Sequence, residues 1–179
     1  GLGVGEAAAV ALHSNHYRAP VMLPAFFGEI ETGKWRSAVP MAFLDLTVIE
    51  PYTLKRASQF RPPPPPRLRS FKYFREYLEV KARGNAAAHP NFETDDGLFW
   101  SVNFIAQWNE TMRQLSDAHL TDINDSARLF ALANAAGADA AIAVWESKRF
   151  YNYWRPITAI QEGDNDRNPL TRGDVTWTP

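Results

Sequence analysis

The sequence contains no cysteine, which excludes disulfide bonds and thiolate metal sites. It also lacks an excess of positive charge, because 19 Lys and Arg residues face 20 Asp and Glu residues and the formal net charge is −1. Such a balance gives no general attraction to nucleic acid or to an anionic membrane surface, and we expect neither partner. The 179 residues are 45% hydrophobic, as is ordinary for a globular protein with a real core.

The sequence also lacks internal repeats and convincing runs of alternating apolar and polar residues, the pattern of a half-buried strand. Its apolar residues recur at helical spacing instead, and frequent prolines exclude long helices from residues 19–66. We therefore predict an all-α fold: a helical bundle that is incomplete in this chain and carries a long Pro-rich irregular segment at 19–66. Residues 1–179 read as a single portion of one larger catalytic domain.

Five helices are expected along this domain. They span residues 6–18, 71–83, 97–115, 122–154 and 156–161. The capping residues that we expect are Ser70 and Gly84 for the second helix and Thr121 or Asp122 for the fourth. Pro156 suits the first turn of the fifth. In the second helix, spacing places Phe71, Phe74, Leu78 and Val80 near one face, which we expect to pack on the core.

The most apolar window runs from Ala127 to Trp145 and is long enough to cross a bilayer. Asn134 and Asp139 inside it, and Arg128 at its edge, make membrane insertion costly. Its many alanines suit close packing between helices. We therefore expect a helix of a protein core and no membrane span.

The stretch KRFYNYWRP, residues 148–156, places two cations seven positions apart. On one continuous helix, Lys148 and Arg155 would point to the same side, about 10 Å apart along the axis. Trp145 and Asn152 would complete the stripe. One interpretation is an anion cradle, in which the arginine fork and the lysine ammonium hold one small oxyanion. The other is two surface cations that bury their stems and pair with carboxylates.

The surrounding sequence favours the first interpretation. DAAIAVWESKRFYNYWRPITAI, residues 139–160, closely resembles the first signature, K-x-x-x-x-x-x-R-P, of the vanadium-dependent haloperoxidases and type 2 phosphatidic acid phosphatases. Further segments are similar to soluble bacterial members of this superfamily, so that the resemblance covers nearly the whole chain. These segments are GKWR at 33–36, QFRPPPPPRLRS at 59–70, EVKARG at 79–84 and ARLFALANAAGADAAIA at 127–143.

The resemblance implies roles for the residues of this stretch. Lys148 and Arg155 match the residues that bind oxygens of vanadate or of a substrate phosphate. Trp145 matches an aromatic position near the halide site of the haloperoxidases. Asn152 shares the predicted stripe and is expected to line the site, and Pro156 ends the motif.

The superfamily's later motifs, P-S-G-H and S-R-x-x-x-x-x-H-x-x-x-D, do not occur here. We therefore expect an N-terminal portion of a longer protein, whether truncated, nicked or incompletely sequenced, and we assign no catalytic residue to it. His13, His16, His89 and His119 match no family motif. His13 and His16 are three residues apart, but no third ligand lies near them in the sequence, so we expect no metal site.

The predicted function is that of a haloperoxidase-like protein in which vanadate is the cofactor and halide and peroxide are the substrates. One alternative is a phosphatase of the same superfamily, which needs no cofactor and hydrolyses phosphate monoesters through a histidine nucleophile. A second is a non-catalytic fragment or an interaction module, with RPPPPPR at 61–67 as a polyproline II ligand. We further expect a second chain that carries the C-terminal half, or a homodimer, and the resemblance suggests a secreted or periplasmic location.

Overall fold

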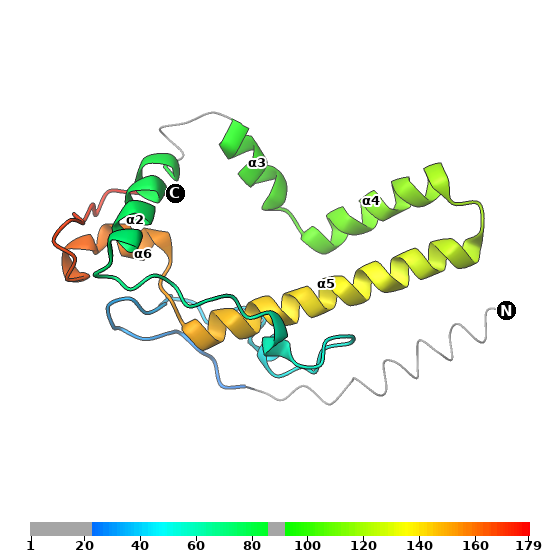
Figure 1. The fold of residues 1–179 in the computed structure, drawn as a ribbon, viewed down its shortest axis with the longest axis horizontal. Helices are drawn as coiled ribbons and strands as arrows, with labels where there is room; N and C mark the ends of the chain where they lie inside the picture. Colours follow the sequence, from blue (N-terminus) through cyan, green and yellow to red (C-terminus); the bar gives the residue numbers. More distant parts are fainter. Residues whose placement is uncertain (1–22, 86–91) are drawn as a thin grey trace.

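The computed structural model describes residues 23–85 and 92–179 (Figure 1). These residues form five α-helices and three short 3-10 helices, and no strand is present among them, which confirms the all-α prediction. The α-helices are α2 (Phe71–Arg83), α3 (Phe92–Trp100), α4 (Phe104–His119), α5 (Ile123–Tyr151) and α6 (Pro156–Gln161); the 3-10 helices are η1 (Leu44–Thr47), η2 (Ala57–Phe60) and η3 (Gly163–Asn165). The helix predicted at 6–18, and His13, His16 and His89, lie outside the described residues.

The long helix α5 pairs with α4 in an antiparallel hairpin (Figure 1). Asp122 caps the start of α5, as predicted, by accepting a hydrogen bond from the backbone N–H of Asn124. The two helices are joined by polar contacts, among them a hydrogen bond of 2.7 Å between the hydroxyls of Ser116 and Ser126. The paired helices form the long arm of the molecule.

Two of the predicted helices differ from the structure. The helix expected at 97–115 is wrong in its bounds, because the chain breaks between α3 and α4 and Asn103 caps the new start. Its side-chain oxygen accepts from the backbone N–H groups of Ile105 and Ala106, which competes with continuing the helix from α3. The helix expected at 122–154 ends at Tyr151, which changes how the chain reaches Arg155.

The helix α2 has the predicted bounds and caps, but its buried face is different. Ser70 accepts from the backbone N–H of Tyr73 and Gly84 follows the last turn. Tyr73 and Tyr77 are buried, whereas Phe71, Leu78 and Val80 are exposed. The tyrosines pack with the residues of one apolar core cluster, which also contains Trp154, Ala159, Ile160 and Trp177.

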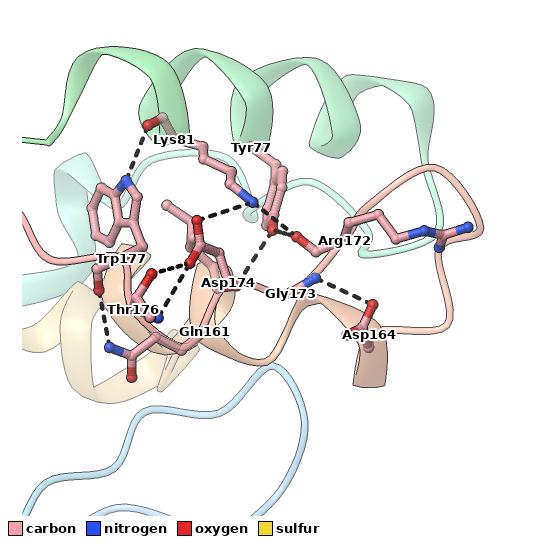
Figure 2. Close-up of polar contacts among 10 residues, drawn as sticks. Tyr77, Lys81, Gln161, Asp164, Arg172, Gly173, Asp174, Thr176 and Trp177 are labelled. Carbon is pink, nitrogen blue, oxygen red and sulfur yellow. Dashed lines mark hydrogen bonds and ion pairs between the residues drawn. The ribbon is translucent and has the colours of Figure 1, made fainter. Parts of the chain in front are cut away.

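The last residues of the chain fold back onto α2 and α6 (Figure 2). The indole N–H of Trp177 donates to the backbone oxygen of Lys81 at 3.0 Å. The hydroxyl of Tyr77 donates to the backbone oxygen of Arg172 at 2.5 Å. The ammonium of Lys81 lies 3.7 Å from the carboxylate of Asp174. These contacts fix the loop after α6 to the outer side of the core cluster.

The irregular segment before α2 lies along α5 and is anchored to it by Asp139. This buried carboxylate accepts hydrogen bonds from the backbone N–H groups of Tyr52, Thr53 and Leu54 at 2.6, 2.8 and 3.1 Å, and from the Thr53 hydroxyl. Burial alone would raise the pKa of Asp139, but these hydrogen bonds outweigh it, and the pKa lies below its ordinary value. Asp139 therefore acts as an ionised anchor in the middle of α5.

The proline run at 62–66 follows this anchor and is held by the end of α5. The hydroxyls of Tyr151 and Tyr153 donate to the backbone oxygens of Pro62 and Pro66, at 2.6 and 3.4 Å. Arg61, just before the run, forms an ion pair with Glu146. The run is thus tied to its own chain at both ends, as expected of a stiff spacer.

Helix α5 is long and apolar enough, by length and composition, to cross a membrane. Of its most apolar window, 11% is buried within the part of the chain that the structure describes. The expectation of a core helix without a membrane span stays a prediction.

We predict that Asp139→Asn lowers the free energy of unfolding by about 2 kcal/mol at neutral pH, because the charge that strengthens four hydrogen bonds is lost. The carboxylate has a lowered pKa in the folded state, so its stabilisation is present above the ordinary aspartate pKa and is lost as pH falls through the lowered value. The difference between the two proteins should therefore shrink below about pH 4. Urea denaturation at several pH values measures it.

Asp117→Asn is the matched control, since Asp117 is exposed on α4. It should leave the free energy of unfolding nearly unchanged at every pH. Equal stability of Asp139→Asn and the parent chain at neutral pH would contradict the anchor.

Candidate oxyanion site

Lys148 lies in the last turn of α5, one turn after Trp145. Its ammonium stands 4.0 Å from the centre of the Trp145 ring, in cation–π geometry. Within the described ranges it forms no ion pair with a carboxylate. Much of the side chain is exposed, but partial desolvation of the ammonium, and then the nearby charge of Arg155, place the pKa of Lys148 below its ordinary value.

Trp145 is itself held in place by the irregular segment. Its indole N–H donates to the backbone oxygen of Ala42 at 2.7 Å. Phe43 packs edge-on against the same ring, with centroids 5.6 Å apart, and adopts a left-handed backbone with φ of 55°. The face of the Trp145 ring therefore contacts the Lys148 ammonium, while its indole N–H is already hydrogen-bonded to the Ala42 carbonyl.

Arg155 reaches this place by a turn of the chain and not along the helix. Asn152 follows the last residue of α5 with φ of 46°, the left-handed conformation that ends many helices. Arg155 lies at the start of α6, before Pro156, with an exposed side chain that forms no ion pair within the described residues. The continuous helical stripe that the spacing predicted is thus absent, although the two cations still lie near enough for Arg155 to lower the pKa of Lys148.

Asn152 forms the corner between the two cations. It is 3% exposed, and its side-chain amide donates to a carboxylate oxygen of Glu29 at 2.5 Å. Its backbone oxygen accepts from the N–H of Trp35 at 2.9 Å. The structure thus shows Asn152 as the residue that docks the segment 29–35 onto the end of α5, and its predicted place in the lining of the site stays a prediction.

The same segment continues the contact on the other side of the corner. The N–H of Trp154 donates to the backbone oxygen of Gly33 at 3.1 Å, and Gly33 has φ of 85°, a conformation that glycine adopts readily. No sequence pattern had placed Glu29, Gly33 or Trp35 at the site. The available signal was the family-like GKWR stretch, which carries two of them.

The acid nearest to Lys148 in the sequence is removed from the site. Glu146 pairs with Arg61, whose guanidinium also lies 3.5 Å above the centre of the Phe150 ring. Lys148 and Arg155 are therefore left with eight N–H donors between them by chemistry, three on the ammonium and five on the guanidinium. Such a set suits a small tetrahedral oxyanion. Among the described residues, no group of three or more His, Cys, Asp or Glu side chains is placed to hold a metal ion.

Comparison with known proteins gives three matches. A family model described as the VCPO second helical-bundle domain matches residues 128–179. Vanadium chloroperoxidase from Curvularia inaequalis is 29% identical over an alignment of 109 residues that covers 52% of this chain and 17% of that protein. A crystal structure titled as the first bacterial vanadium-dependent iodoperoxidase matches with a TM-score of 0.70 at 24% identity, over 96% of this chain and 46% of that one.

The family-model and chloroperoxidase matches support the predicted resemblance to the vanadium-dependent haloperoxidase superfamily. The structural match confirms the helical bundle fold. The family model covers Lys148, Arg155 and the rest of the KRFYNYWRP stretch. The chain spans less than half the length of either relative, so the activity of a whole protein is a matter for proposal.

We predict that Arg155→Gln raises the pKa of Lys148 toward the ordinary lysine value of about 10.4, because a like charge is removed. NMR titration of the lysine side chains measures this directly. Arg128→Gln, on the first turns of α5, removes the same charge elsewhere and should leave the pKa of Lys148 where it is. An unmoved pKa in Arg155→Gln would show that the two cations do not share a site.

Proposed function

We propose that this chain provides Lys148 and Arg155 to an oxyanion site that holds vanadate in a haloperoxidase-like protein. The observation that carries the proposal is that Lys148, held against Trp145, and Arg155, just past the corner at Asn152, have no carboxylate partner among the described residues. Like charges brought together cost free energy, so an anion that binds between them is favoured. The similarity to a vanadium chloroperoxidase, and the family-model match that covers both cations, support vanadate as that anion.

The residues present fit vanadate by the chemistry of their donors. Arg155 offers a planar fork to two oxygens, and Lys148 offers a compact charge to a third. Trp145 restricts the ammonium from one side, so that less side-chain freedom is lost when the anion binds. When bound, vanadate supplies the chemistry that lets peroxide oxidise halide, while this chain orients and neutralises the oxyanion.

The alternative function is a phosphatase of the same superfamily. Phosphate has the shape and charge of vanadate, and the Lys148–Arg155 pair serves it equally well. In that reading the two cations stabilise the charge on the phosphoryl oxygens. Assays of iodide oxidation with peroxide and of phosphate monoester hydrolysis, on the same full-length protein, separate the two activities.

The second alternative is an interaction module. The hairpin of α4 and α5 leaves an apolar hollow of about 540 Å³, bordered by Ile105, Trp108 and Gly137. An uncovered apolar surface of this kind is typical of an interface. Binding of oxyanion by the chain tests the site proposal independently of what covers this hollow.

The prediction from the proposed function is that Arg155→Ala reduces the affinity for orthovanadate by about 100-fold or more, since two charge-assisted hydrogen bonds are lost. Titration calorimetry measures the affinity, and circular dichroism with thermal unfolding shows that the fold remains, because Arg155 is exposed and contributes no side-chain contact to the core.

Arg128→Ala is the control for loss of one exposed cation on α5, and it should bind orthovanadate like the parent chain. Unchanged orthovanadate affinity in Arg155→Ala would remove the basis of the proposed function.

A further inference from the structure

A second cationic hollow lies at the end of the molecule that carries α2 and α6, apart from the Lys148–Arg155 pair. Its volume is about 580 Å³, and three arginines line it: Arg67, Arg69 and Arg167. They come from two segments that are about a hundred residues apart in the sequence and that meet at this end (Figure 1). The hollow is therefore made by the fold and not by a local run of charge.

Four other arginines of the described chain have carboxylate partners, which these three lack. Arg36 pairs with Glu162, Arg61 with Glu146 and Arg113 with Glu110. No ion pair within the described residues involves Arg67, Arg69 or Arg167. Three guanidiniums on one hollow are thus left to an outside anion.

The frame beneath the arginines is rigid. Asn168 is buried, and its side-chain amide donates to the backbone oxygen of Leu68 at 2.7 Å, which holds the loop of Arg167 against the segment of Arg67 and Arg69. Asp166 is 2% exposed, and both its carboxylate oxygens accept from the hydroxyl of Thr171 at 2.8 Å. A ligand would meet arginines whose backbone is already positioned, which lowers part of the ordering cost of binding.

Arg167 adopts a backbone that its side chain does not favour. Its φ is 60°, in the left-handed region where glycine is most readily accommodated. Non-glycine residues in that region gather at functional sites. An arginine at a position that glycine would fit more easily agrees with a binding role for its side chain.

Two acids also border the hollow and set its charge. Asp166 is engaged by Thr171 and by the backbone N–H of Asn168, so it faces the frame, whereas Glu31 is exposed. Three arginines against these two carboxylates leave one net positive charge. The hollow is larger than a single inorganic phosphate, and the arginine fork matches phosphate oxygens.

We propose that Arg67, Arg69 and Arg167 form a second anion site that binds a small diphosphate group. Inorganic pyrophosphate is the probe, because it carries two phosphate groups and nothing else. The test is titration calorimetry at low ionic strength on a Lys148→Ala, Arg155→Ala background, in which the vanadate site is absent. One pyrophosphate should still bind, and orthophosphate should bind more weakly.

Single changes in that background then identify the hollow. Arg69→Gln and Arg167→Gly should each lower pyrophosphate affinity about fivefold, as expected for a partly exposed cation. Arg167→Gly should not lower the unfolding temperature, since glycine suits the left-handed backbone, and this separates loss of the site from loss of the fold. Glu31→Gln should raise the affinity.

Arg113→Gln, on α4, is the matched control and should bind pyrophosphate as the background does. Equal affinity in Arg69→Gln, Arg167→Gly and Arg113→Gln would overturn the proposal, and so would loss of all pyrophosphate binding in the Lys148→Ala, Arg155→Ala background. Because the vanadate titrations use the parent chain and the pyrophosphate titrations use this background, either site can fail without the other.

Discussion

The turn at Asn152 is the constraint on which the candidate site depends. This buried residue ends α5 in a left-handed conformation, binds Glu29 through its side chain and accepts from Trp35 through its backbone oxygen. The chain consequently leaves the helix axis just before Arg155, and α6 starts in a new direction. On one straight helix, the separation of Lys148 and Arg155 would be fixed by the helical rise. Here it is determined by the turn at Asn152.

The irregular segment before α2 supports this corner from several points along α5. Asp139 binds three backbone N–H groups near Thr53, and Trp145 binds the backbone oxygen of Ala42. The proline run is tied to Tyr151 and Tyr153. A segment with only two short 3-10 helices is therefore ordered by side chains of α5 and of the turn after it, and it fixes the indole ring that Lys148 contacts.

Much of the fold followed from local sequence signals. The caps at Ser70 and Asp122, and Pro156 at the start of α6, set helix ends by short-range hydrogen bonds and backbone sterics, which sequence carries directly. Spacing alone could not show that α5 stops at Tyr151, because the αL conformation of Asn152 depends on contacts with residues more than a hundred positions earlier. For the same reason Tyr73 and Tyr77 bury their side chains in α2 while Phe71 stays exposed: the partners, Trp154 and Trp177, come from the far end of the chain.

The sequence predicted which two residues form the cation pair, but it could not predict how their side chains are arranged. Lys148 and Arg155 were identified by the K-x-x-x-x-x-x-R-P spacing, while the cation–π contact with Trp145 and the supporting residues Ala42 and Phe43 needed the fold.

The most direct measurement is a crystal structure of the chain with orthovanadate. The account predicts an anomalous vanadium peak bridging the Lys148 ammonium and the Arg155 guanidinium; a peak elsewhere, with these two side chains pointing apart, would contradict it.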